Sequence, residues 1–444
     1  EFKNNYYQDN CFCEEVFEHS GNPDNSEEVR TNIEEQIDLD LVSRFEGSPK
    51  KNQVDMTFSE YPKVVLMMLR QDAGKEGEII RSNREKYFLL DEFQDTDPVQ
   101  MQIFLYLATS KPMIDYSKNI PRPGSLFVVG DPKQSIYHFR YADVTIYLRI
   151  KALFESEEFE NCEVLALYRN FRSTRALLEG FNGVFPSLFK ESKYQCKYPL
   201  IPIEASAENS NEKSGIYGVR FTAERKVSEQ GRNYTYEEIE KIVKLISSIV
   251  DNEKWLIRKK VEENGVEKYV SARIYPEDVM VLTYTNNKAM TVETELKRFN
   301  LEGVDVRTIH KAKGLEKPVV ILAFHHYFEY HAPHTVITYN DDSTQGRIMN
   351  VWLDDKKNGK VDKRNGRAEW KDSLIHNYFN PELLKQEMKA DEAEQVRLRY
   401  VAITRAKNLL FVFKFRGLYK NKEDHGIFWC LSEVSKEFEY SEET

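Results

Sequence analysis

The chain has 444 residues and a formal net charge of −10, from 63 Lys and Arg against 73 Asp and Glu, and 41% of its residues are hydrophobic. This composition is typical of a globular protein with several domains, and it excludes collagen-like, fibrous and wholly disordered chains. The acidic balance excludes a protein that coats nucleic acid through bulk positive charge, but it allows a local basic track.

The number of cysteines and the length of the apolar runs indicate the cellular compartment of the protein. Five cysteines leave at least one unpaired, and the pair Cys11 and Cys13 lacks a second pair that would complete a tetrahedral metal site. The longest apolar runs have six residues, at 64–69 and 319–324, far below the roughly 18 needed to cross a bilayer. We therefore expect a cytoplasmic protein with free thiols and no membrane partner.

The first predicted elements are a helix at 61–70, whose apolar spacing gives one buried face, and a short strand at 87–90. This apolar run ends in Asp91 and Glu92, which predicts a buried strand that delivers two carboxylates into a crevice. An Asp at such a position can hold hydrated Mg²⁺ while the Glu orients or deprotonates a water, as phosphoryl transfer requires. On its own, the pattern suits a solvated turn equally well.

Short apolar runs followed by polar residues recur downstream and alternate with helical spacing at 237–250 and 290–299. The runs lie at 126–129, 164–167, 279–282, 319–323 and 409–413. This alternation is typical of parallel α/β units, and the chain is long enough for two such sheets. The polar segments 204–214 and 354–365 are expected to be exposed loops.

Four more motifs follow the DEFQDTD sequence in order along the chain. After residues 91–97 come VGDPKQSIYHFR at 129–140, RNFRS at 169–173, RTIHKAKGLE at 307–316 and RYVAITRAK at 399–407. Together they resemble motifs II to VI of the superfamily 1 DNA helicases of the UvrD/Rep group, and they are most similar to the AddA/RecB helicase subunits. The resemblance runs from about residue 87 to residue 407.

This resemblance implies an α/β fold with two RecA-like parallel-sheet domains of the P-loop NTPase type, the first of them incomplete. The expected domains are a helical accessory remnant at 1–84, a partial first RecA-like domain with motifs II and III at 85–158, and a second with motifs IV to VI and loop insertions at 159–444.

The resemblance also implies roles toward ATP and Mg²⁺. Asp91 would bind the metal, Glu92 would be the catalytic base, and Gln134 would sense the γ-phosphate. Fixed guanidinium groups on both sides of a cleft suit a transition state with charge on several oxygens, although each arginine alone could equally form a surface or interface ion pair. The remaining ATP contacts would be adenine stacking by Phe171, γ-phosphate contacts by Arg172 and the arginine finger Arg405, and a ribose hydrogen bond by Glu316.

Residues of motifs III and V are candidates for nucleic acid contacts. Tyr137, Phe139 and Arg140 place aromatic faces beside a cation, which suits stacking of unpaired bases, although Tyr137 could equally belong to the core. The resemblance adds Thr308 and His310 as backbone or base contacts. Two lysines of motif V, Lys311 and Lys313, are candidate phosphate contacts.

No phosphate-binding loop of the G-x-x-x-x-G-K-[ST] type occurs in the sequence. The simplest expectation is that the chain starts downstream of this loop and is the C-terminal part of an ATP-dependent DNA helicase, inactive in isolation. The full protein would move 3′ to 5′ on single-stranded DNA from duplex ends in repair or recombination, and its candidate protein partner is a second helicase/nuclease subunit. Two alternatives stay open: a non-catalytic helicase-like scaffold that docks a recombination partner, and an RNA-directed helicase of the same superfamily.

Overall fold

The structure is a computed structural model that describes residues 61–73, 87–113, 118–140, 142–156, 162–189, 204–207, 213–220, 233–263, 265–323, 335–339, 346–350, 381–414 and 435–438. The Cys11 and Cys13 pair and the loop expected at 354–365 lie outside these residues. The chain divides into two compact units, residues 1–86 with 102–121 and residues 87–101 with 122–444. The domain boundaries predicted at 84 and 158 stay predictions.

The helix predicted at 61–70 is confirmed as α3, Tyr61–Ala73. Leu66 and Leu69 are buried, and Arg70 Nη2 donates a 2.8 Å hydrogen bond to Oε1 of Gln102, which lies in α5, Pro98–Ala108. The expected helical character of the rest of residues 1–84 falls outside the described residues. Among the described residues, no helix is both long and apolar enough to cross a membrane.

A six-stranded sheet forms the centre of the second unit, and all of its neighbouring strands are parallel. The α/β prediction with a parallel sheet is therefore confirmed, as are the strands predicted at 279–282, 319–323 and 409–413. The order across the sheet is β14 (Lys436–Phe438), β5 (Gly215–Arg220), β13 (Ala406–Lys414), β10 (Lys317–Leu322), β8 (Val279–Thr283) and β9 (Asp305–Thr308).

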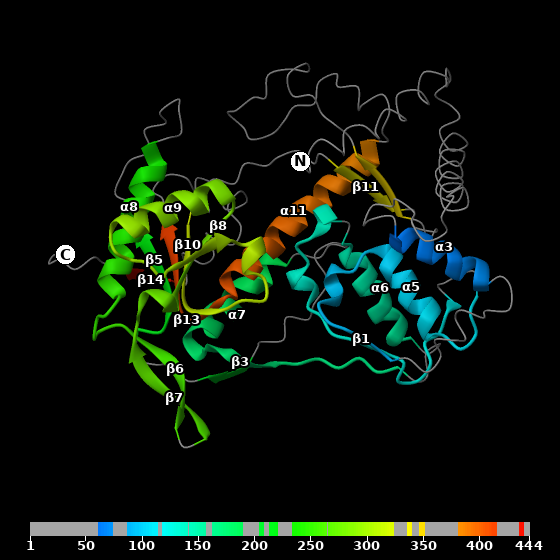
Figure 1. The fold of residues 1–444 in the computed structure, drawn as a ribbon, viewed down its shortest axis with the longest axis horizontal. Coiled ribbons are helices and arrows are strands. Elements are labelled where there is room, and N and C mark those ends of the chain that lie inside the picture. Colours follow the sequence, from blue (N-terminus) through cyan, green and yellow to red (C-terminus); the bar gives the residue numbers. More distant parts are fainter. Residues whose placement is uncertain are drawn as a thin grey trace, which may run out of the picture. The chain divides into compact units, whose positions relative to one another are not determined.

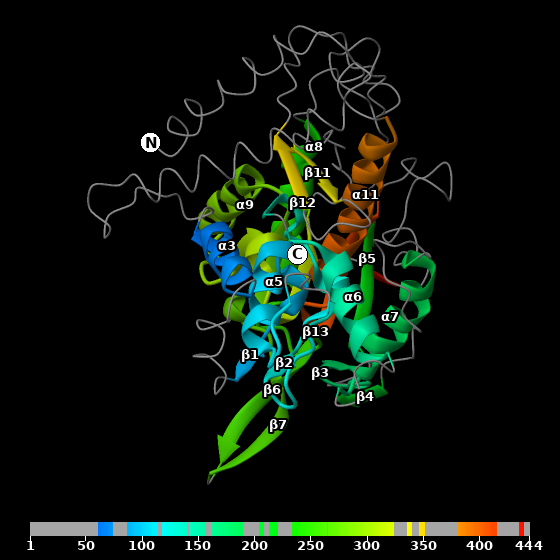
Figure 2. The ribbon, with the colours of Figure 1, turned by 90° about the vertical axis from the view of Figure 1, so that its right-hand side faces the viewer.

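Helices cover both faces of this sheet (Figures 1 and 2). Alternate residues of β8 belong to opposite cores, Met280 and Leu282 to one and Val279 and Val281 to the other. Because both faces are buried, the strand reads as a continuous apolar run. The helices that pack on the two faces are α7 (Arg175–Leu188) and α11 (Pro381–Ile403) on the first, and α8 (Asn233–Ile249) and α9 (Asn286–Arg298) on the second.

A second, two-stranded parallel sheet carries motifs II and III and consists of β1, Phe88–Leu90, and β2, Leu126–Val128. Both strands lie where the sequence predicts them, but the prediction that the first is buried is wrong. Leu89 is 74% exposed and Phe127 is 58% exposed, because alternate residues point to a face of this small sheet that no described element covers.

The segment before motif IV also differs from expectation. Residues 164–167 form no strand, and Leu167 is 98% exposed, because an apolar run becomes a strand only where a neighbouring strand accepts its hydrogen bonds. The strand begins instead within the motif, as β3, Arg169–Thr174, and pairs in parallel with β4, Glu204–Ala207. The loop expected at 204–214 is therefore partly wrong.

An antiparallel hairpin, which the sequence analysis did not predict, precedes β8. It consists of β6, Leu256–Glu263, and β7, Val266–Arg273, and its turn contains Gly265 with a φ of +75°. At its base, Lys259 Nζ pairs with Oδ2 of Asp278 at 2.8 Å. The hairpin projects from the end of the six-stranded sheet toward the side on which β3 lies (Figure 1).

Candidate functional site

Two acidic side chains follow β1 directly. Glu92 adopts the left-handed conformation, with φ 50° and ψ 38°, which non-glycine residues rarely adopt outside functional or tightly constrained sites. Its backbone N–H donates to Oδ1 of Asp91 at 2.8 Å, and its carboxylate accepts a hydrogen bond from the side-chain amide of Gln94. The fixed backbone therefore sets the direction of the Glu92 carboxylate.

Gln94 joins motif II to motif III. It is 1% exposed, its Oε1 accepts the backbone N–H of Asp131 at 3.0 Å, and its carbonyl accepts the Ser135 hydroxyl at 3.0 Å. A Cβ at Gly130 would lie 2.5 Å from Gln94 Oε1, so only glycine fits there without movement. Gln94 was not among the residues predicted from the sequence, although its place inside DEFQDTD was the available signal.

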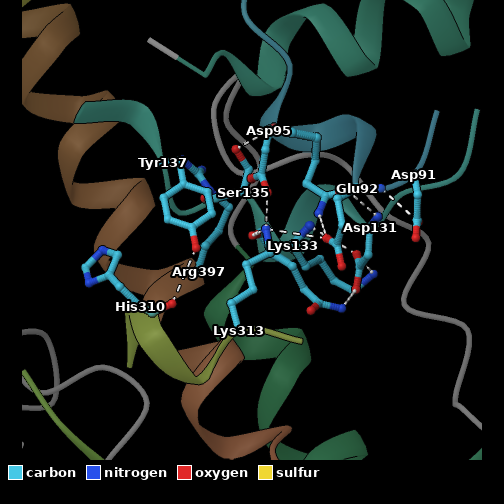
Figure 3. Close-up of polar contacts among 12 residues, drawn as sticks. Asp91, Glu92, Asp95, Asp131, Lys133, Ser135, Tyr137, His310, Lys313 and Arg397 are labelled. Atoms are coloured by element: carbon cyan, nitrogen blue, oxygen red, sulfur yellow. Dashed lines mark hydrogen bonds and ion pairs between the residues drawn. The ribbon is translucent and has the colours of Figure 1, made fainter. Parts of the chain in front are cut away.

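Lys313 of motif V lies among the acids of motif II (Figure 3). Its Nζ forms an ion pair with Asp95, donates to the carbonyl of Gln134 at 2.9 Å and lies 3.5 Å from Glu92 Oε2, while its side chain is 6% exposed. Burial raises the pKa of Asp95, and the nearby Glu92 adds to this, against the opposing effect of Lys313. The phosphate contact suggested for Lys313 stays a prediction.

Arg405 of motif VI meets Gln134 of motif III. Its Nη2 donates to Gln134 Oε1 at 3.0 Å, its Nε donates to the carbonyl of Val401 at 2.9 Å, and its Nη1 donates to that of Leu315 at 3.2 Å. Burial first and the charge of Arg172 second lower the pKa of Arg405 to about 10, so the guanidinium still carries its charge at neutral pH. Gln134 and Arg405, both predicted to act at the γ-phosphate, are therefore in direct contact.

A stripe on α11 holds motif III from the other side. Glu394, Arg397 and Tyr400 are three residues apart and so share a helix face. Glu394 Oε1 accepts the backbone N–H of His138 at 3.0 Å, Arg397 Nε donates to the carbonyl of Ser135 at 2.6 Å, and the Tyr400 hydroxyl donates to Asp131 Oδ2 at 3.3 Å. This stripe was not predicted from the sequence, and its signal was the i, i+3 spacing of the three polar side chains.

Glu316 of motif V lies between two cations. Arg172 of motif IV forms an ion pair with it, and Lys407 Nζ lies 2.8 Å from its Oε1. Burial would raise the pKa of Glu316, but the hydrogen bond from Lys407 and the charge of Arg172 outweigh this effect and hold it below the ordinary value. A cavity of about 220 Å³ adjoins these three residues and includes Phe171, which is 69% exposed.

The predicted nucleic acid contacts fall into two groups. The Tyr137 hydroxyl donates to the carbonyl of His310 at 3.4 Å, their rings lie 6.3 Å apart, and Arg140 lies 5.6 Å from the Tyr137 ring centroid. Burial lowers the pKa of His310. Thr308, by contrast, is 6% exposed at the end of β9, and the side chain of Phe139 lies outside the described part of the chain. Tyr137 also packs against a buried core cluster, so the core interpretation applies in part.

The residues present fit a magnesium ion in one respect. Mg²⁺ in phosphoryl-transfer sites takes one or two carboxylates and completes its octahedron with water and substrate phosphate. Asp91 is exposed at the end of β1 and lies on the far side of Glu92 from Lys313 (Figure 3), so it can supply such a carboxylate. The described residues contain no group of three or more His, Cys, Asp or Glu that could cage a metal without substrate.

Comparison with known families supports the interpretation of the motifs. Residues 20–155 match the UvrD/REP helicase N-terminal domain, and residues 203–417 match the UvrD-like helicase C-terminal domain. The two matches cover more than half of the chain. It belongs to the UvrD-like helicases.

Two relatives of this helicase chain agree with the subfamily that the sequence indicates. It is 30% identical over 226 residues to an ATP-dependent helicase/nuclease subunit of Staphylococcus epidermidis, which is 47% of this chain and 17% of the relative. It is 44% identical over 124 residues to RecBCD enzyme subunit RecB of Chlamydia trachomatis, 28% of this chain and 11% of the relative. The matched parts therefore span less than a fifth of these relatives, and the predicted similarity to the AddA/RecB type is confirmed.

Proposed function

We propose that this chain is part of an ATP-dependent DNA helicase that couples ATP hydrolysis to 3′ to 5′ movement on single-stranded DNA in repair or recombination. The observation that carries this proposal is the meeting of Arg405 with Gln134, together with the approach of Lys313 to Glu92 and Asp95. These contacts bring cations of motifs V and VI to the acids and amides of motifs II and III, as catalysis on a triphosphate requires.

The chemistry follows from these positions. Glu92 orients or deprotonates the attacking water, and Arg172 and Arg405 stabilise charge on the equatorial oxygens of the transferred phosphoryl group. Asp91 would hold a magnesium ion, which would supply positive charge to the phosphates of the substrate. Since backbone carbonyls hold Nε and Nη1 of Arg405 and the Thr404 hydroxyl accepts from Nη2, the guanidinium is preorganised and loses little entropy when it meets phosphate.

Coupling to DNA would pass through Tyr137. Its ring lies 5.1 Å from Lys313 Nζ, which contacts the motif II acids, and its hydroxyl contacts the carbonyl of His310. A base that stacks on Tyr137 or Arg140 would therefore lie beside the lysine that contacts the motif II acids. If both ligands change the surroundings of Lys313, their binding free energies are thermodynamically linked.

Isolated residues 1–444 are expected to hydrolyse ATP poorly, because the sequence lacks the loop that cradles the phosphates. The relatives' names contain the word subunit, which supports a protein partner of the helicase/nuclease type.

A DNA-stimulated ATPase assay tests the proposal. We expect little turnover from residues 1–444 and strong turnover from the same residues expressed with the upstream part of their gene, abolished by Glu92→Gln. The matched control is Arg298→Ala, an exposed charge change on α9 that should leave turnover intact. If the longer protein binds single-stranded DNA but does not hydrolyse ATP, the scaffold alternative is correct. Preference for RNA over DNA would favour the RNA-directed alternative.

A further inference from the structure

The cavity beside Phe171 is lined in part by residues that lie outside the helicase motifs. Arg258 of β6 and Tyr269 of β7 line it, together with Phe171, Arg172 and Glu316. Arg258 pairs with Ser271, and Tyr269 pairs with Lys260, so Arg258 and Tyr269 are diagonal neighbours on one face of the hairpin. The face of the hairpin that carries Arg258 and Tyr269 is therefore the one that lines the cavity.

Arg258 and Tyr269 form one flat surface. The guanidinium carbon of Arg258 lies 3.5 Å from the centroid of the Tyr269 ring, which is the geometry of a stacked cation–π pair. Tyr269 nevertheless remains 49% exposed and Phe171 69% exposed. Two aromatic rings and a planar cation with free area around one cavity are the lining that a flat, electron-rich heterocycle requires.

The size and polar lining of the cavity further restrict the class of ligand that it can bind. A volume of about 220 Å³ is below the roughly 300 Å³ at which pockets for whole drug-sized ligands begin, so it suits a base and part of its sugar. Glu316, which is paired with Arg172 and Lys407, is an acceptor that suits ribose hydroxyls. A nucleotide of DNA lacks the 2′-hydroxyl, so ATP fits this lining better than a DNA strand does.

We propose that the β6–β7 hairpin is part of the nucleotide site, and that Tyr269 and the Arg258 stacked on it contact the purine base of ATP in the cavity beside Phe171. This inference rests on the proposed function, which supplies ATP as the substrate. It adds two binding residues outside the helicase motifs and assigns a purpose to a hairpin that otherwise projects from the sheet.

Binding of ADP to residues 1–444, followed by ligand-observed NMR because affinity without a phosphate loop is low, tests the assignment. We expect Tyr269→Ala and Arg258→Ala to weaken binding about five- to thirtyfold, the loss that removal of one base-stacking partner produces. Tyr269→Phe should bind like the wild type, because it retains the ring. The matched control is Glu262→Ala, an exposed residue of the same hairpin that does not line the cavity.

Phe171→Ala separates failure of the inference from failure of the proposed function. If Phe171→Ala weakens ADP binding and the two hairpin variants do not, the hairpin has no nucleotide role and the helicase proposal stands. If the wild type binds no ADP at all, the inference fails, while the helicase proposal is decided by the ATPase assay of the longer protein. If the hairpin variants lose binding to a dT oligonucleotide while ADP binding is unchanged, the hairpin contacts DNA and the inference is overturned. Matching circular dichroism melts show that the variants are folded.

In the longer, active protein the same variants supply a second readout. A contact to the base is equally strong in the ground state and the transition state, so its loss should raise KM for ATP about five- to thirtyfold and leave kcat unchanged. A fall in kcat with unchanged KM would contradict a base contact.

Discussion

Nη2 of Arg405 donates a 3.0 Å hydrogen bond to Oε1 of Gln134, across 271 residues of sequence. Arg405 is 1% exposed, and Leu315 and Val401 offer their carbonyls to its other nitrogens. A residue expected to act only on ATP is thus also a structural bridge between motifs III and VI. Its catalytic and structural contributions can be separated by experiment.

Arg405→Ala should lower the free energy of unfolding by about 2–4 kcal/mol, because it leaves several buried acceptors unpaired. Arg405→Lys should recover part of the loss, since Lys keeps the charge but its compact ammonium cannot span the acceptors that the wider guanidinium reaches. Urea unfolding measures both. Arg298→Ala, which breaks an exposed ion pair with Glu295 at 2.6 Å, should change stability by less than about 0.5 kcal/mol. Equal effects at the two sites would contradict the structural role of Arg405.

Gly130→Ala should destabilise the protein by about 1–3 kcal/mol, because its Cβ would lie 2.5 Å from Gln94 Oε1 and displace that oxygen from the Asp131 N–H. The second mutation Gln94→Ala removes the clash. In a double-mutant cycle by urea unfolding, Gly130→Ala should therefore cost less in the Gln94→Ala background. Additive effects would show that the Gln94 side chain is not what excludes a Cβ at position 130.

The sequence predicted the fold best where both faces of a strand are buried. The run at 279–282 is apolar throughout and became the fully buried strand β8. The run at 164–167 looks the same but has no neighbouring strand among the described residues, so Leu167 stays exposed. Strand formation depends on partners far along the chain, and an apolar run alone does not reveal them.

The site residues that lie in recognisable sequence motifs were predictable. The residues that reach the site only through tertiary contacts were not. Asp91, Arg172 and Arg405 were named from sequence, and their motifs meet in the second unit. Lys313 was expected at phosphate and is ion-paired with Asp95, and neither Glu394 nor Tyr269 was singled out, because both act through positions that only helix α11 and the hairpin create.

Lys313→Met should destabilise the protein more at pH 7 than at pH 4. Burial already raises the pKa of Asp95, so the native state binds its proton more tightly than the unfolded state and loses stability as pH rises above about 3.8. Removing Lys313 takes away the cation that opposes this shift, and the pKa of Asp95 should rise further. The loss at pH 7 should be about 3–5 kcal/mol, the scale for a buried ion pair that loses one partner.

Asp95→Asn is the control for this prediction. In that background the carboxylate is gone, so Lys313→Met should cost nearly the same at pH 4 and pH 7. The cycle is measured by urea unfolding of the wild type, the two single variants and the double variant, each at pH 4 and pH 7. A pH dependence that persists in the Asn background would assign it to Glu92, whose Oε2 lies 3.5 Å from Lys313 Nζ.

Glu394→Gln should become more stable relative to the wild type as pH rises. Burial raises the pKa of Glu394 above its ordinary 4.5, against the opposing effects of His138 and Arg397, so the native state favours the protonated acid. The free energy of unfolding of the wild type therefore falls as pH rises from about 4.5 toward the folded-state pKa. Glutamine does not ionise, so the variant does not lose this stability. Glutamine also keeps an oxygen that can accept the His138 N–H.

Urea unfolding of the wild type and Glu394→Gln at pH 4.5, 6.0 and 7.5 measures this difference, with Glu392→Gln, an exposed neighbour on α11, as the matched control. The control should track the wild type at all three pH values. A Glu394→Gln variant that loses stability relative to the wild type as pH rises would mean that the carboxylate form is the stabilised one, held by Arg397. The stripe on α11 would then hold motif III through charge rather than through a neutral hydrogen bond.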